Sequence, residues 1–171
     1  ERESARALYD LLTNRVSSIS AAPQGIAGYY FSHKATDNFI AVNRLLAAGE
    51  DVSWLANGPM GYGTFYVASK ASTRANIQKI ANEVGTSFQS TATAPSGPMS
   101  HLKPLRIGIV DSYGGSVEAG WTRLAMENFE FKFEQVFPPM LDAGNLRAKY
   151  DVLLCIDMCF RGGAGGRGAG G

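Results

Sequence analysis

The sequence has little of what metal and disulfide chemistry require. It contains two histidines, His33 and His101, and two cysteines, Cys155 and Cys159. A catalytic zinc site normally uses three protein ligands, mostly histidine with a carboxylate, and neither histidine belongs to a His-x-x-Glu or His-Glu-x-x-His pattern. The Cys-x-x-x-Cys spacing matches neither a zinc knuckle nor a redox Cys-x-x-Cys pair. We therefore predict no metal site, no catalytic metal ligand and no disulfide framework in this chain.

An excess of one charge and a long apolar run are also missing. The 16 Lys+Arg and 15 Asp+Glu leave a formal net charge of +1, which argues against a nucleic-acid partner. No segment approaches the ~20 consecutive apolar residues of a membrane span, and no signal-peptide pattern is present. Neither nucleic acid nor membrane is therefore expected as a partner. What the chain does have is 171 residues, 45% of them hydrophobic, enough to form a folded core.

Glycine is concentrated at one end. Of the 20 glycines, seven fall between Gly162 and Gly171, so residues 161–171 are expected to form a flexible glycine-rich tail. Two arginines without interleaved aromatic residues make an RNA-binding Arg-Gly segment the weaker interpretation. The chain begins at Glu1 inside an expected helix and ends in glycine just after an apolar run. We expect both ends to be cuts in a longer polypeptide.

Hydrophobic spacing predicts alternating helices and strands. In residues 1–90 we expect a helix at 3–19, a strand at 28–31, a helix from Thr36 or Asp37 to Ala48, strands at 52–55 and 64–67, and a helix from Ser72 or Thr73 to Val84. Residues 91–104 contain three prolines and are expected to link two units. In residues 105–160 we expect strands at 105–110, 133–137 and 152–156, a helix lined by Trp121, Leu124, Ala125 and Phe129, and a short helix at 141–148. Strands without polar alternation, separated by helices, are typical of a parallel sheet covered on both faces. The predicted fold class is α/β, with two consecutive units.

The turn after the strand at 105–110 is the candidate ligand site. It reads Asp111-Ser112-Tyr113-Gly114-Gly115-Ser116-Val117-Glu118, which is neither a dinucleotide fingerprint nor a Walker loop. Its glycines can free backbone N–H groups at a helix N-terminus to hold an anion or a carbonyl oxygen. In that interpretation Tyr113 and Trp121 form walls and Arg123 binds a carboxylate. The plainer interpretation is that Gly114 and Gly115 make a tight turn, Ser116 caps the helix, and Trp121 lies in the core.

The two cysteines have separate interpretations. Cys155 lies inside the apolar strand at 152–156, where it is expected to act as a small buried hydrophobic residue. Cys159 lies just past the end of that strand, where parallel sheets place ligands. A nucleophilic role for Cys159 has no nearby histidine in the sequence to support it.

Several stretches of the sequence together resemble a known region. The stretches are Gly28-Tyr29-Tyr30, Asn38-Phe39-Ile40-Ala41-Val42-Asn43-Arg44-Leu45-Leu46, Gly63-Thr64-Phe65-Tyr66-Val67, Arg106-Ile107-Gly108-Ile109-Val110, Gly120-Trp121-Thr122-Arg123, Glu127-Asn128-Phe129-Glu130-Phe131, Asp142-Ala143-Gly144-Asn145-Leu146 and Tyr150-Asp151-Val152-Leu153-Leu154. Over nearly its whole length the chain is similar to the region downstream of the catalytic domain in large bacterial zinc carboxypeptidases of the carboxypeptidase A-like class.

The resemblance implies both a fold and a role. It implies a flavodoxin-like, class I glutamine amidotransferase-like domain in which the second unit is truncated. It also implies an accessory region without catalytic residues of its own, whose partner is an upstream catalytic domain that holds zinc. The parent would be secreted or periplasmic. Because flavodoxin-like sheets usually have about five strands, we expect the strand at 152–156 to need covering by the first unit, by a second copy of the chain through self-association of the truncated sheet, or by sequence outside this chain. The alternative function is a small-molecule or peptide-end binding module that uses the turn at 111–118.

Overall fold

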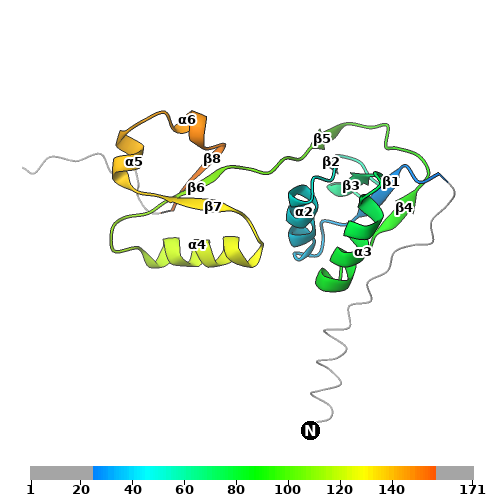
Figure 1. The fold of residues 1–171 in the computed structure, drawn as a ribbon, viewed down its shortest axis with the longest axis horizontal. Coiled ribbons are helices and arrows are strands. Elements are labelled where there is room, and N and C mark those ends of the chain that lie inside the picture. Colours follow the sequence, from blue (N-terminus) through cyan, green and yellow to red (C-terminus); the bar gives the residue numbers. More distant parts are fainter. Residues whose placement is uncertain (1–24, 157–171) are drawn as a thin grey trace, which may run out of the picture. The chain divides into compact units, whose positions relative to one another are not determined.

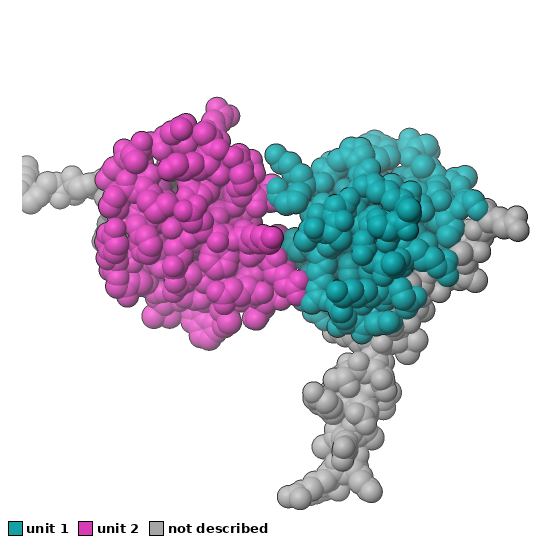
Figure 2. All heavy atoms as spheres, viewed as in Figure 1, with its two compact units in different colours: residues 1–104 teal, residues 105–171 magenta. Residues whose placement is uncertain are grey.

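The computed structural model describes residues 25–156, which fall into two compact units, residues 25–104 and residues 105–156 (Figure 2). The helix expected at 3–19, Cys159 and the tail expected at 161–171 lie outside the described residues. The segment expected as a linker, 91–104, contains a short strand, and the units divide between Pro104 and Leu105.

The first unit contains an antiparallel sheet and two helices. Its elements are β1 (Gly28–Phe31), α2 (Asn38–Ala47), β2 (Val52–Leu55), β3 (Thr64–Ala68), α3 (Thr73–Val84), β4 (Gln89–Thr91) and β5 (Met99–His101). The strand order is β4-β1-β3-β2-β5, and every neighbouring pair is antiparallel. From β1 to β4 the chain has the split βαβ arrangement of ferredoxin-like domains.

The predicted flavodoxin-like parallel sheet is therefore wrong. In the first unit α2 connects β1 to β2, but β3 lies between these two strands and runs antiparallel to both. Strands that alternate with helices along the sequence predict a parallel sheet, because parallel strands are joined by a crossover that is usually a helix. The signal against it is the direct β2–β3 connection, where the turn-rich residues 58–61 make a hairpin instead of a helix.

The core of the first unit lies between one face of this sheet and the two helices. Successive strand residues point to opposite faces, so Tyr29 and Phe31 of β1 point inward together with Phe65 and Val67 of β3. The helices contribute buried residues at helical spacing: Ala41, Val42 and Leu45 from α2, and Ile77, Ile80 and Ala81 from α3. Gly85 ends α3 in the left-handed conformation, with φ of 78°.

Residues 92–98 link opposite edges of this sheet. They connect β4 at one edge to β5 at the other, and Figure 1 shows them on the side of the sheet away from α2 and α3. The carbonyl oxygen of Thr91 accepts from Ala27 N–H at 2.8 Å, and that of Pro98 accepts from Ala56 N–H at 3.4 Å, which fixes the connection at both ends.

The second unit is a three-stranded parallel sheet. Its elements are β6 (Ile107–Val110), α4 (Val117–Asn128), β7 (Phe133–Val136), α5 (Pro138–Asp142), α6 (Leu146–Lys149) and β8 (Val152–Cys155), with strand order β7-β6-β8. The uninterrupted apolar strands are parallel here as expected, but three strands do not make a flavodoxin-like sheet. The single helix expected at 141–148 is two short helices, separated by Gly144 and Asn145 with φ of 69° and 55°.

Helices lie on both faces of this sheet (Figure 1). Val110, Val136 and Leu153 share one face, where they pack against Leu141 of α5 and Leu146 of α6. Ile107 and Ile109 point to the other face, and α4 packs on β6 there. On α5 and α6 no residue is fully buried, and on α4 only Ala119 is, so each helix covers its face with a narrow apolar stripe.

Candidate functional site

The turn that follows β6 is at the carboxyl edge of the parallel sheet, where open α/β sheets bind ligands. Gly114 and Gly115 have φ of 98° and 72°, values that favour glycine. Ser116 is the N-cap of α4, and its side chain accepts a hydrogen bond from Ala119 N–H at 3.0 Å. The glycine turn and the serine cap of the plainer interpretation are therefore both present.

Asp111 is the buried acidic residue of this turn. It is 7% exposed and accepts a hydrogen bond from the backbone N–H of Ser112 at 2.8 Å. Arg123 Nη1 lies 3.9 Å from Asp111 Oδ2, close enough for electrostatic attraction but too far for a hydrogen bond. A ligand carboxylate that bound Arg123 would therefore compete with Asp111 for the guanidinium.

An aromatic pair stands beside the turn. Tyr113 stacks on Phe137 with ring centroids 5.0 Å apart and an interplanar angle of 4°, and Tyr113 is 73% exposed. Phe137 directly follows β7, the parallel neighbour of β6. Sequence reasoning missed Phe137 as a site residue, although residues after neighbouring parallel strands meet at one edge of the sheet.

Trp121 lies elsewhere. It is 66% exposed, so the expectation that Trp121 lies in the core is wrong. Leu124, on the same helix, is 43% exposed. Residues two apart in a helix are separated by about 200°, so Trp121 and Arg123 point to different sides of α4. The structure therefore brings Asp111, Tyr113 and Arg123 to the turn and leaves Trp121 on a different face of α4. Glu118, in the first turn of α4, is exposed.

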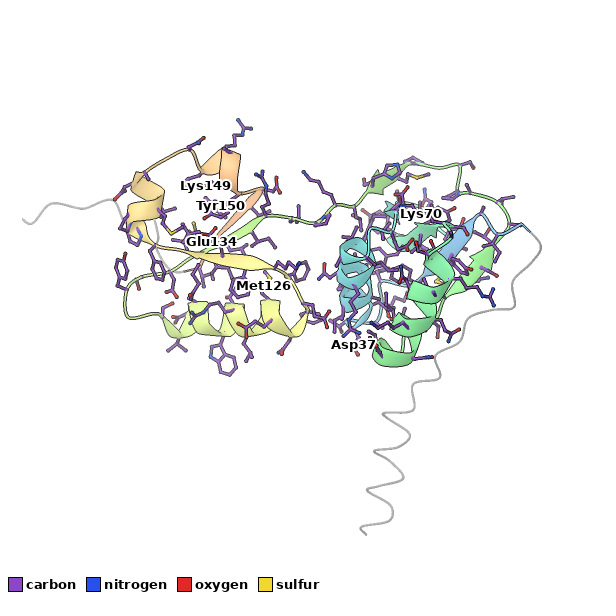
Figure 3. All side chains as sticks on the ribbon, in the orientation of Figure 1. Asp37, Lys70, Met126, Glu134, Lys149 and Tyr150 are labelled. Atoms are coloured by element: carbon purple, nitrogen blue, oxygen red, sulfur yellow. The ribbon has the colours of Figure 1, made fainter. Side chains whose placement is uncertain are left out.

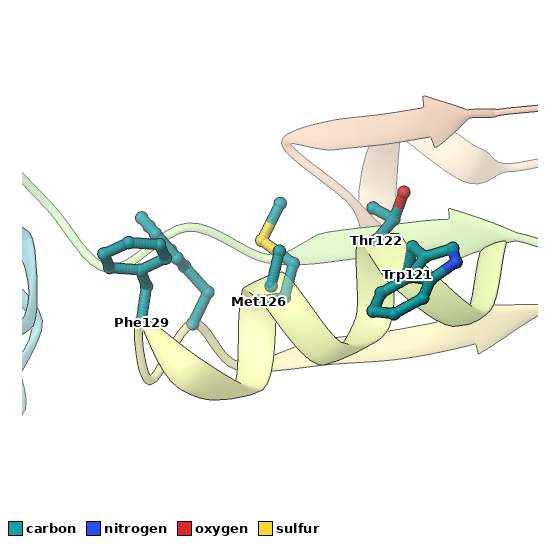
Figure 4. Close-up of a pocket in the computed structure, with 6 residues that line it drawn as sticks. Trp121, Thr122, Met126 and Phe129 are labelled. Atoms are coloured by element: carbon teal, nitrogen blue, oxygen red, sulfur yellow. The ribbon is translucent and has the colours of Figure 1, made fainter. Parts of the chain in front are cut away.

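Trp121 instead borders an apolar groove along α4. The groove has a volume of about 350 Å³ and is lined by Trp121, Thr122, Ala125, Met126, Phe129 and Phe131. In Figure 4, Thr122 and Met126 project from α4 on the flank where β8, in faint orange, runs. Val117, 72% exposed, lies one helical turn before Trp121 and extends the apolar surface.

The first unit brings a serine, a histidine and an aspartate together. His101 Nδ1 lies 3.1 Å from Ser53 Oγ and 3.4 Å from Asp51 Oδ1. In a Ser–His–Asp relay the serine and the carboxylate contact different ring nitrogens. Here both approach Nδ1, and Ser53 is 2% exposed. This cluster therefore lacks relay geometry, and it joins the edge strand β5 to β2.

Other polar groups stabilise the fold. The buried Glu50 carboxylate accepts hydrogen bonds from Ser72 Oγ at 2.7 Å, Thr73 Oγ1 at 2.5 Å and Asn76 Nδ2 at 2.7 Å. Burial alone would raise the pKa of Glu50, but these hydrogen bonds and the charge of Lys70 lower it below its ordinary value. Tyr150 Oη donates to Glu134 Oε2 at 2.8 Å (Figure 3). These carboxylates therefore serve the structure.

Metal ligands do not gather in the described part of the chain. Among residues 25–156 no three side chains of His, Cys, Asp or Glu are grouped to hold a metal ion. His33 Nδ1 is buried without a hydrogen-bond partner, and its ring lies 5.8 Å from that of Trp54. Cys155 is exposed, contrary to the expectation that it is buried in its strand.

Comparisons with known proteins give no relative. No protein-family model, curated protein sequence or solved structure matches this chain. Within residues 25–156 there is also no helix with the length and hydropathy of a membrane span.

Proposed function

We propose that this chain is a non-catalytic accessory region that binds polypeptide, in a protein resembling the large bacterial zinc carboxypeptidases. The observation that carries the proposal is the apolar surface of α4, where Val117, Trp121 and Leu124 are 72%, 66% and 43% exposed. Exposed apolar patches of this kind mark interaction sites in soluble proteins. The proposed partner is the zinc-containing catalytic domain of the same polypeptide, in a secreted or periplasmic protein.

The chemistry of the polar residues supports this proposal. Acidic side chains accept structural hydrogen bonds: Glu50 from Ser72 and Thr73 at the start of α3, and Asp151 from Arg106. The one Ser–His–Asp cluster described above has both partners on a single ring nitrogen. A nucleophile needs a base that can take its proton within a relay of the right geometry.

Zinc analysis and a carboxypeptidase assay test the proposal. The purified chain is dialysed against equimolar zinc, its bound zinc is measured, and release of C-terminal residues from model peptides is followed. The expected result is less than stoichiometric zinc and no release above buffer. Stoichiometric zinc together with release of C-terminal residues would overturn the accessory role. A zinc carboxypeptidase assayed alongside shows that the peptides are substrates.

A second candidate function is peptide-end or small-ligand binding at the turn after β6. The observation that favours it is the exposed face of Tyr113, which stacks on Phe137 next to the backbone N–H of Gly114. The N–H of Gly115 already donates to the carbonyl oxygen of Ser112 at 2.9 Å. The test is an NMR titration with two peptides, one with a free C-terminal carboxylate and one amidated. A shift of the Gly114 amide with the free carboxylate alone would support this function. Equal shifts with both peptides, or none at millimolar concentration, would exclude it.

A further inference from the structure

Strand β8 is an edge strand without a charged side chain. Within the described residues it pairs with β6 alone. Val152, Leu153 and Leu154 are each half-buried, whereas all four residues of β6 are buried. An apolar edge strand is a ready template for pairing with another strand.

The backbone of β8 indicates which residue is available for pairing. The N–H of Val152 donates to the carbonyl oxygen of Arg106 at 3.2 Å, so the peptide groups of Val152 face β6. Because these groups alternate in direction along a strand, the N–H and C=O of Leu153 face away from β6. Leu153 can therefore exchange both hydrogen bonds with a residue on an added strand.

We propose that two copies of this chain associate through β8, antiparallel about a two-fold axis at Leu153. Leu153 of one copy then exchanges both hydrogen bonds with Leu153 of the other, and the two sheets become continuous. Opposed residues in an antiparallel pair point to the same face, so Val152 meets Leu154 of the other copy on the face that carries α4. No charged residue lies between Val152 and Cys155, so no like charges meet.

The groove on α4 favours a second copy over other occupants. The two-fold axis keeps both α4 helices on one face and sets the two β6 strands three strand spacings, about 14 Å, apart. Packed helices lie about 8–10 Å apart, so a channel of about 4–6 Å remains between the helices. Trp121 and Met126 of both copies line that channel and have the size to fill it. A helical peptide would fill the groove but leave β8 unpaired, and an extended peptide would pair β8 but leave the groove empty.

Disulfide trapping tests the register. The background carries Cys155→Ser and Cys159→Ser, and a single cysteine is introduced by Leu153→Cys. Directly opposed, hydrogen-bonded residues have Cα atoms about 5.5 Å apart, within the 4.4–6.8 Å range typical of disulfides. Mild oxidation is expected to give a covalent dimer. The matched control is Leu154→Cys, whose two copies would be offset by two residues, about 8 Å apart, and is expected to remain monomeric on a non-reducing gel. Equal cross-linking at both positions would overturn the register.

Sedimentation equilibrium tests association without a new cysteine. The unmodified chain is expected to associate as its concentration rises, and Leu154→Lys is expected to weaken association at least tenfold. Leu105→Lys is the matched control, since Leu105 is 42% exposed and belongs neither to β8 nor to the groove lining. A concentration-independent monomer of the unmodified chain would overturn the proposal, as would equal effects of the two lysine variants. These outcomes are independent of the zinc and peptidase assays.

Discussion

Removal of the Glu50 carboxylate is expected to destabilise the first unit strongly. Glu50 is 5% exposed and precedes β2, and its three hydrogen-bond donors lie on the first turns of α3 and at its N-cap. The carboxylate therefore joins the α2–β2 connection to the N-terminus of α3, where a negative charge is also favoured by the helix dipole. Ser72, the N-cap residue of α3, has a helical backbone conformation and makes no side-chain cap; its hydroxyl donates to Glu50.

The magnitude follows from what Glu50→Ala leaves behind. Each hydrogen bond to a charged group contributes about 1.5–3 kcal/mol. Ser72 is exposed and can donate to water, and Thr73 Oγ1 also lies 3.2 Å from the carbonyl oxygen of Ala68, which partly replaces the lost acceptor. The expected loss is therefore about 2–4 kcal/mol. The control Glu83→Gln removes a surface pair with Arg44 and should cost less than about 1 kcal/mol.

Urea unfolding monitored by tryptophan fluorescence measures this loss. The chain has two tryptophans, one in each unit, so a Trp121→Phe background leaves Trp54 as the reporter of the first unit. The pH dependence gives a second signature. The pKa of Glu50 is below its ordinary value of 4.5, so the stability that its charge contributes is present above pH 4.5 and is lost as the pH falls below it. Glu50→Gln should reduce the fall in the free energy of unfolding below pH 4.5. The assigned role would be refuted if this fall were the same in Glu50→Gln as in the unmodified chain. It would also be refuted if Glu50→Ala lost no more stability than Glu83→Gln.

Three further substitutions test the packing of the two units. Gly28→Ala should destabilise the first unit by about 1–3 kcal/mol in urea unfolding, because an added Cβ would collide with the Val67 carbonyl oxygen and the Tyr66 ring. The control is Gly97→Ala, where an added Cβ meets no atom within 4 Å. Equal effects of the two substitutions would contradict the packing at Gly28. Tyr150→Phe should cost about 1 kcal/mol by loss of the hydrogen bond to Glu134, measured by thermal unfolding of the second unit; no change would mean that water replaces the bond. Trp121→Ala should change stability by less than about 1 kcal/mol, because its side chain is largely exposed, and a larger loss would place it in the core.

Individual helices and strands could be predicted from the sequence, because they depend on the spacing of apolar residues and on nearby capping residues. Apolar spacing and the stop at Gly85 predicted α3, and the structure has that helix at Thr73–Val84 with Gly85 as its C-cap. The strands predicted at 28–31 and 52–55 are confirmed as β1 and β2. Such features depend on residues within one or two turns of one another.

The strand order of the sheets and the exposure of the apolar side chains on α4 could not be predicted in this way. Strand order depends on which strands pair across the chain, and β3 inserts between β1 and β2 only in the folded sheet. The stripe on α4 was read correctly as apolar but wrongly as buried, because spacing alone does not say whether anything packs on a helix face. The turn at 111–118 was placed at the carboxyl edge of the sheet, but the stacking of Tyr113 on Phe137 depends on pairing with β7.

Whether two copies of this chain associate through β8 and the groove on α4 is tested most directly by amide hydrogen exchange at low and high protein concentration. Protection of the Leu153 amide is expected to rise with concentration, together with shielding of the Trp121 indole from a soluble quencher. The amides of β6 report the unit itself, because they lie inside the sheet and should be protected at every concentration. A Leu153 amide that exchanges equally at all concentrations, with Trp121 equally accessible, would contradict the assignment of β8 and the α4 groove to self-association.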